Sequence, residues 1–239
     1  MEHPNIFLFD FDGVIITQKA LEYTALELIR NKTFRIRNNE HLRLIDYAKM
    51  FELSDSNNKI EALIQAFRNY KEIIPSRWRR LFFFYLFRKR YKKYEKIYEE
   101  LEPNIEELLN LLKVRGNPMA IVSNTNRPRL NFFKNKFSLD RFFRVIITQD
   151  DVPYRKPHAY PILRAIQLIK REFGFAKIDR NKVFMIGDLP SDIASAKAAK
   201  IKSIAILSGH GNTQELEKLK PDLICKNLTA LLKEEIPYL

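Results

Sequence analysis

The sequence predicts an α/β protein with a parallel sheet, helices on both faces of the sheet, and an all-helical insertion after the first strand. Two observations support this prediction. Beyond residue 103, short apolar runs alternate with helix-like stretches, which is typical of strand–helix–strand crossover units. Between residue 18 and about residue 99, by contrast, no comparable strand-like run occurs. A chain of 239 residues is long enough for one large domain, or for a core domain with a smaller partner.

The first predicted strand is Asn5–Phe9, a short apolar run that stops at a polar loop. Four further apolar runs follow it, at residues 119–123, 144–148, 183–187 and 203–207. Helix-like segments alternate with these runs, at residues 105–114, about 129–137, 160–173 and 191–199. This order predicts a Rossmann-like sheet whose strands are parallel and whose helices cover both faces.

The domain boundaries follow from where this alternation starts and stops. Residues 1–16 and 100–239 are expected to form the core, and residues 17–99 a helical domain inserted into it. Helical patterns in the insertion lie at residues 19–30, 40–52 and 57–72, and from Ser76 onward. Pro75, just before the last of these helices, is a typical residue near a helix start.

Composition narrows the class of protein. Hydrophobic residues make up 46% and charged residues 30%, which is an ordinary globular mixture. The one cysteine, Cys225, excludes an intrachain disulfide and a cysteine-based zinc site, so we expect a cytoplasmic protein. The first residues lack the charge pattern of a signal peptide. The longest apolar run, Leu81–Phe87, has seven residues where a membrane span needs about 18, so no transmembrane segment is expected.

The chain is basic, with a formal net charge of +13 and a pI of about 9.7. Much of the excess lies in Arg68–Lys96, a segment with 11 basic and two acidic residues that also has six aromatic residues between positions 78 and 87. A buried helix with a charged outer face is the simplest explanation. Steering of a phosphorylated substrate, contact with nucleic acid and attachment to an anionic membrane surface are the alternatives.

Four polar clusters lie where the predicted core strands end. They are Asp10-Phe11-Asp12-Gly13, Ser123-Asn124-Thr125, Arg155-Lys156-Pro157 and Gly187-Asp188-Leu189-Pro190-Ser191-Asp192. In an open parallel sheet, ligands bind beyond the carboxyl ends of the strands, so these clusters are expected to converge on one crevice. Each cluster alone is a weak signal, and their shared placement makes the combined signal strong.

This set of motifs resembles that of the haloacid dehalogenase-like (HAD) hydrolase superfamily. Six residues match the four motifs of that superfamily in order: Asp10 and Asp12, Ser123, Lys156, and Asp188 and Asp192. The helical insertion stands where the family has its C1 cap. The sequence Glu102-Pro103-Asn104-Ile105 resembles the return to the core in phosphoglycolate-phosphatase-like members, whereas Val14 and Ala199-Lys200 depart from that subgroup.

The resemblance implies a role for each motif residue, and the residue types suit these roles. Asp10 would attack phosphorus and form an aspartyl-phosphate, since a carboxylate is a nucleophile that needs no base. Asp12 would give a proton to the leaving group and later take one from water. Ser123, Asn124 and Lys156 would bind the phosphoryl oxygens. A plain helix N-cap is the alternative role for Ser123.

The same resemblance implies a magnesium site. Two anionic carboxylates beside an anionic phosphate repel it unless a cation neutralises them. Mg²⁺ is the expected cofactor, held by Asp10, the backbone carbonyl of Asp12 and Asp188. Asp192 would complete the metal site by holding Asp188 or a metal-bound water.

The expected function is therefore a Mg²⁺-dependent phosphatase acting on a small phosphomonoester. Asp12 argues against dehalogenase chemistry, because a halide leaves without protonation and an alkoxide does not. A phosphosugar mutase could carry the same core residues, and a phosphonatase-like activity is not excluded. A binding protein that uses the basic Arg68–Lys96 segment on nucleic acid or an anionic surface is the alternative from another class.

Overall fold

The computed structural model describes residues 4–31, 34, 68, 70–209 and 211–235, with the side chains of the last two left out. The chain divides into two compact units, one made of Met1–Thr17 with Leu101–Leu239 and the other of Gln18–Glu100. Among the described residues, no helix is long and apolar enough to cross a membrane.

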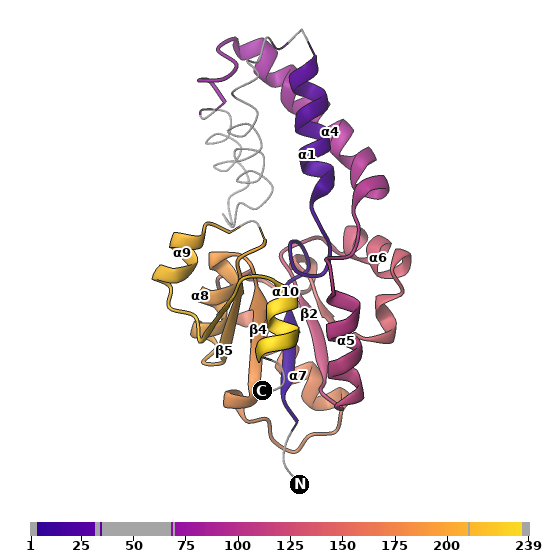
Figure 1. Ribbon diagram of the computed structural model, residues 1–239, viewed down its shortest axis with the longest axis vertical. Helices are drawn as coiled ribbons and strands as arrows, with labels where there is room; N and C mark the ends of the chain where they lie inside the picture. The colour runs from indigo at the N-terminus through magenta and orange to yellow at the C-terminus, as the bar shows by residue number, and fades with distance from the viewer. Residues whose placement is uncertain (1–3, 32–33, 35–67, 69, 210, 236–239) are drawn as a thin grey trace. The chain divides into compact units, whose positions relative to one another are not determined.

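The first unit is built on a parallel sheet of six described strands in the order β3-β2-β1-β4-β5-β6. Strands β2, β4 and β5 of this sheet are labelled in Figure 1. The strands are β1 (Ile6–Phe9), β2 (Met119–Val122), β3 (Val145–Ile147), β4 (Val183–Gly187), β5 (Lys202–Ile206) and β6 (Leu223–Cys225). In the pairing of β1 with β4, Leu8 lies opposite Met185, and β1 pairs with β2 on its other side. The predicted parallel α/β fold is confirmed.

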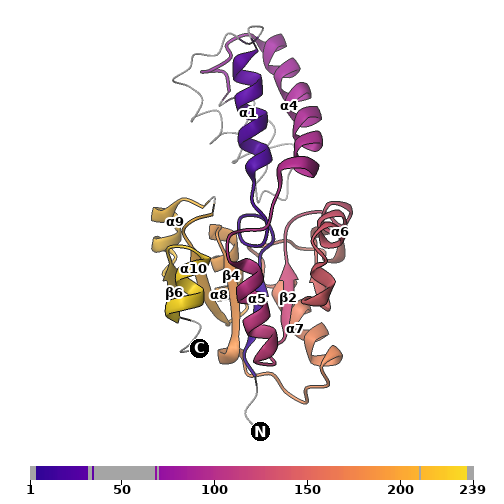
Figure 2. The same ribbon diagram turned by 45° about the vertical axis from the view of Figure 1, so that its right-hand side comes forward.

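Side chains of successive strand residues point to opposite faces of the sheet, and helices cover both faces. Phe7 and Phe9 pack in the cluster that contains α5 (Ile105–Val114), α6 (Arg127–Lys136) and α10 (Leu228–Ala230). Ile6 and Leu8 pack in the cluster that contains α7 (Tyr160–Glu172) and α8 (Pro190–Ala198). Figure 2 shows α5 and α7 with the sheet between them. A strand with both faces covered is apolar throughout, which is why these runs do not alternate.

Short elements complete the first unit. The 3₁₀ turns are η2 (Leu139–Arg141), η3 (Gln149–Asp151) and η4 (Arg180–Lys182). Helix α9 (Thr213–Lys218) joins β5 to β6, and a π-helical turn, η5 (Leu231–Glu235), continues α10. The sequence patterns do not predict β6 or the helices around it. Strand β6 has three residues at the sheet edge and half-exposes Ile224, so it lacks the apolar run that marks the inner strands.

Two described helices form the frame of the second unit, α1 (Lys19–Arg30) and α4 (Arg77–Tyr98), and they lie side by side in both views (Figure 1 and Figure 2). Their shared core includes Leu21, Leu28, Phe83 and Phe87. The helices expected at residues 40–52 and 57–72 lie outside the described residues, apart from a few positions at the end of the second.

The sequence favours a helix whose aromatic residues are buried, and in α4 this holds for only some of them. Phe83 and Phe87 are buried, but Trp78 is 79% exposed and Tyr85 is 60% exposed. A helix can turn one stripe of its surface to a core, so consecutive aromatic residues cannot all be buried by one contact. Arg80 is buried as well, and its Nη1 donates to the backbone carbonyls of Ile74 (2.8 Å) and Pro75 (2.9 Å).

Candidate active site

The candidate site lies at the carboxyl edge of the sheet. Asp10 directly follows β1, Ser123 follows β2 and Asp188 follows β4. Ladder-like hydrogen bonds continue one residue past the strands: the Asp10 N–H donates to Ile186 O (2.9 Å) and the Ser123 N–H to Ile147 O (3.0 Å). The polar side chains therefore start from fixed backbone at one end of the sheet, as the sequence predicts for parallel strands.

Lys156 lies at the centre of this site and contacts several of its residues. Its Nζ lies 2.8 Å from Asp10 Oδ1 and donates to Asp192 Oδ1 at 2.5 Å and to the backbone carbonyl of Val122 at 2.9 Å. The whole residue is 1% exposed, and Asp192 is fully buried. Asp192 also accepts the backbone N–H of Leu189 at 3.0 Å, which fixes the first turn of α8. The structure thus brings three of the predicted site residues into direct contact.

The electrostatics of this group reflect an excess of negative charge. Burial lowers the pKa of the Lys156 ammonium, but the charges of Asp10 and Asp192 outweigh burial and hold that pKa above its ordinary value. Burial and the charge of Asp10 raise the pKa of Asp192, against the opposing effect of Lys156. Both pKa values are raised, but burial is the main cause only for Asp192; for Lys156 the two neighbouring carboxylates are the cause.

The carboxylates around Lys156 fit a hard divalent cation. Asp10, Asp188 and Asp192 each offer an oxygen, and these oxygens lie within 4.8 Å of one another in a buried group. Three carboxylates beside one ammonium leave an excess of negative charge that a divalent cation would balance, and oxygen ligands are those that Mg²⁺ prefers. The carboxylate of Asp12 is not part of this group.

Two glycines permit the close packing of this acidic group. A Cβ on Gly187 would lie 2.3 Å from Asp192 Cβ, and a Cβ on Gly209 would lie 2.2 Å from Asp188 Cβ. Neither contact is sterically possible, so a larger residue at either position would push an aspartate out of place. The positions of Asp192 and Asp188 therefore require glycine at residues 187 and 209.

Asn124 links the second and third sequence motifs. Its Oδ1 accepts the backbone N–H of Lys156 at 3.0 Å, and its Nδ2 donates to the backbone carbonyl of Lys156 at 3.0 Å. This amide is therefore engaged with the backbone that carries the Lys156 side chain. The direct binding of phosphate by Asn124, expected from the sequence, stays a prediction.

Ser123 is buried beside these residues, and its Oγ accepts the backbone N–H of Thr125 at 3.2 Å. The alternative that Ser123 caps the next helix is wrong. Helix α6 begins four residues later, at Arg127, and its N-cap is Asn126, whose side chain accepts the backbone N–H of Arg129 at 2.9 Å. The Ser123 hydroxyl is therefore not committed to a helix terminus.

Asp12 has a different partner from Asp10. Nη1 of Arg129 donates to both carboxylate oxygens of Asp12, at 2.7 and 2.9 Å. Sequence reasoning missed Arg129, which stands in the first turn of α6, 117 residues away from Asp12. A basic residue shortly after the second motif is the one signal that could have indicated it.

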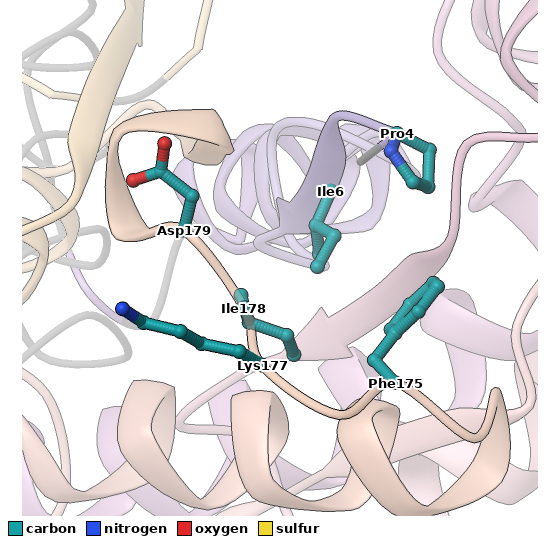
Figure 3. A pocket seen from close by; sticks show the side chains of 6 residues that line it. All are labelled: Pro4, Ile6, Phe175, Lys177, Ile178 and Asp179. Carbon is teal, nitrogen blue, oxygen red and sulfur yellow. The ribbon is translucent and has the colours of Figure 1, made fainter. Parts of the chain in front are cut away.

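The pocket drawn in Figure 3 is not part of this site. Its lining includes Ile6, Phe175 and Asp179, at the amino ends of β1 and β4. It therefore lies at the opposite end of the strands from Asp10 and Asp188.

Comparison with known proteins identifies the family. Residues 7–206 match the family described as haloacid dehalogenase-like hydrolase. The chain belongs to this hydrolase family. Among its curated relatives is the pyrophosphatase PpaX of Bacillus mycoides, 25% identical over 232 residues that cover 95% of both chains. Phosphoglycolate phosphatase of Escherichia coli is 29% identical over 132 residues, which cover 55% of this hydrolase and 50% of that relative.

Solved structures resemble the hydrolase over nearly its whole length. A protein described as a predicted phosphoglycolate phosphatase from Haemophilus somnus has a TM-score of 0.70 at 20% identity, and 98% of each chain is covered. A HAD-superfamily hydrolase of subfamily IA, variant 1, from Geobacter sulfurreducens has a TM-score of 0.65 at 18% identity, with 95% of this chain and 94% of that chain covered. At these identities the likeness shows the fold.

Proposed function

We propose that this hydrolase is a Mg²⁺-dependent phosphatase that acts on a small phosphomonoester through a phosphorylated Asp10. One observation supports this most: the buried Lys156 ammonium between the carboxylates of Asp10 and Asp192. A cation held this way can draw a phosphoryl oxygen to the carboxylate that attacks phosphorus. The names of two relatives, a pyrophosphatase and a phosphoglycolate phosphatase, support the same class of small phosphorylated substrate.

The proposed reaction has two steps. In the first, a carboxylate oxygen of Asp10 bonds to phosphorus, the bond from phosphorus to the leaving oxygen breaks, and Asp12 gives that oxygen its proton. In the second, Asp12 takes a proton from water, the water oxygen bonds to phosphorus, and Asp10 leaves as a free carboxylate. The proton is returned in each cycle, so the net reaction is hydrolysis of the ester.

The other motif residues would hold the phosphoryl group during both steps. Lys156 and the Ser123 hydroxyl would each donate to a phosphoryl oxygen. Both residues are buried: Lys156 lies against Asp10, and Ser123 follows the neighbouring strand β2. Asn124 would contribute by fixing the backbone of Lys156 through its two amide contacts. These donors would take the place of water around the phosphate, and Lys156 would exchange one of its three present contacts for a phosphoryl oxygen.

Mg²⁺ is part of the proposal. We assign it to the carboxylates of Asp10 and Asp188 and to the backbone carbonyl of Asp12. Asp192 lies in the same acidic group and accepts a hydrogen bond from Lys156. When bound, it would offset the charge between the phosphate and the aspartates. We also propose that residues 17–99 form the family's helical cap on a core of residues 1–16 and 100–239, and the compact unit Gln18–Glu100 supports that division.

The test is a screen of phosphate release with Mg²⁺ over pyrophosphate, phosphoglycolate, sugar phosphates, nucleotides and an aryl phosphate. We expect release from at least one small phosphomonoester, and its loss in Asp10→Asn with the fold retained by circular dichroism. Transfer of the phosphoryl group to a second hydroxyl without free phosphate would indicate a mutase instead. An Asp10→Asn variant that keeps a tenth or more of the wild-type turnover would rule out Asp10 as the nucleophile.

A further inference from the structure

Arg129 contacts Asp12 through a single guanidinium nitrogen. One nitrogen, Nη1, lies within hydrogen-bond distance of both Asp12 oxygens and also 3.2 Å from Thr125 Oγ1. The side chains of Arg129 and Asp12 are 14% and 18% exposed, so water screens the pair much less than it screens a surface ion pair. This contact ties the first sequence motif to the loop of the second.

The arginine is itself held in place from several directions. Its guanidinium lies over the rings of Phe133 and Phe11, 5.3 and 6.0 Å from their centres. Its backbone N–H donates to the N-cap residue Asn126, which fixes it in the first turn of α6. The guanidinium that pairs with Asp12 therefore also contacts two core rings, and its backbone is fixed at a helix start.

We infer that Arg129 is a positioning residue that fixes the Asp12 carboxyl for proton transfer to the leaving group. The inference rests on the proposed acid and base role of Asp12. A proton-transferring carboxyl must come within about 2.6–3.2 Å of the leaving oxygen. Asp12 sits in a loop where Gly13 turns the backbone at a φ of 76°, and the carboxyl lies outside the buried group around Lys156. Contact with Arg129 therefore sets where this carboxyl points.

The consequence depends on the leaving group. An alkyl phosphate expels a basic alkoxide and needs the proton, whereas an activated aryl phosphate expels a stabilised phenolate and needs it less. Loss of the anchor should therefore slow the first step with alkyl substrates by about tenfold to a hundredfold, as misplaced catalytic groups do. For aryl substrates, the loss in the first step should be about threefold or less on the same reasoning.

The experiment is a double-mutant cycle of wild type, Arg129→Met, Asp12→Asn and the double variant. Single-turnover release of the leaving group is measured with enzyme in excess, for one alkyl and one aryl phosphate. We expect Arg129→Met to lose rate selectively on the alkyl substrate and to cost nothing further in the Asp12→Asn background. Arg129→Lys keeps a cation but cannot reproduce the guanidinium's contacts, so an intermediate loss is expected even if Arg129→Met folds poorly.

Arg127→Met is the matched control, because Arg127 stands in the same helical turn and pairs with Asp151. It should change neither rate selectively. Equal losses on alkyl and aryl substrates, or a full loss from Arg129→Met in the Asp12→Asn background, would overturn the inference. If Asp12→Asn alone leaves both rates unchanged, the acid role of Asp12 is wrong and the inference falls with it, while the nucleophile Asp10 is tested separately.

Discussion

Asp10 and Asp12 are two residues apart in the same loop, yet their surroundings differ. The side chain of Asp10 is 5% exposed and lies against Lys156, which contacts a second buried carboxylate on Asp192. The side chain of Asp12 is 18% exposed and pairs with the single guanidinium of Arg129. One region is a buried network of alternating charges, and the other is a pair at its edge.

The different surroundings of Asp10 and Asp12 suit two different needs of the proposed reaction. A nucleophile and the groups that hold phosphate gain from a fixed, dry environment, because electrostatic interactions are stronger there. A carboxyl that exchanges protons with a leaving group and with water needs access to both. Changes in the buried network should therefore cost stability as well as activity, and changes at the pair should cost mainly activity.

The largest effect is expected from Lys156→Met. Removing the ammonium leaves Asp10 and Asp192 buried without their shared cation, which typically costs about 3–5 kcal/mol of unfolding free energy. Urea unfolding in EDTA measures this, with the exposed Lys170→Met on α7 as the control. A Lys156→Met variant as stable as the control would mean that the network contributes little to the fold.

Magnesium is expected to act on the same network. A cation bound to the acidic group stabilises the folded state by about 2.7 kcal/mol at a hundred times its dissociation constant. EDTA should also abolish phosphate release, and Mg²⁺ should restore it. Thermal unfolding with and without Mg²⁺ tests the site, and Asp188→Asn should lose most of the shift. A shift of the same size in Asp188→Asn would place the bound metal elsewhere.

Asn124→Ala should have a smaller effect. It leaves the backbone N–H and carbonyl of Lys156 without their side-chain partner, and a partly buried polar group that loses its partner costs about 1–3 kcal/mol. Activity should fall as well, since Lys156 would be less firmly placed. The measurement is urea unfolding beside the exposed Asn181→Ala. Equal stability of the two variants would show that the two hydrogen bonds of the Asn124 amide are dispensable for the fold.

The smallest effect is expected outside both regions, at Asp151. Burial of this carboxyl raises its pKa, but hydrogen bonds from Thr148 and the charge of Arg127 outweigh it and hold the pKa below its ordinary value. A lowered pKa contributes stability above about pH 4, which is lost as the pH falls through the folded-state value. Because the carboxyl is 32% exposed, Asp151→Asn should cost less than about 1 kcal/mol at pH 7.

The pH dependence gives the check on Asp151. Urea midpoints of wild type and Asp151→Asn should differ near neutral pH and converge as the pH is lowered to about 3. A difference that stays constant over this range would show that the contacts of Asp151 do not depend on its charge.

The sequence was sufficient to predict the strands that carry the site and the polar residues that end them. Buried parallel strands are continuous apolar runs, and a charged residue at the end of such a run stands out. Arg129 could not be predicted in the same way, because its contact with Asp12 joins residues 117 positions apart and it is one of 42 basic residues. The pairing follows from the position of α6 beside the first loop, which is a property of the packed fold.

Asn124 illustrates a second limit. An amide at a strand end can bind phosphate or satisfy a backbone, and the residue type is the same in both cases. Its two hydrogen bonds to the backbone of Lys156 depend on a loop that returns 32 residues later.

Helix α4 illustrates a third limit, since the pattern of aromatic residues alone did not indicate that Phe83 is buried while Trp78 is exposed.

The central claim is that Asp10 carries the phosphoryl group during turnover. The most direct measurement is an acid quench in the course of single turnover with a substrate found in the screen, followed by proteolysis and mapping of the phosphorylated peptide. We predict a hydroxylamine-sensitive acyl phosphate on Asp10 that forms and decays at rates compatible with turnover and is absent in Asp10→Asn. Phosphate release with no phosphorylated Asp10 at any time, accompanied by persistent activity of Asp10→Asn, would contradict it.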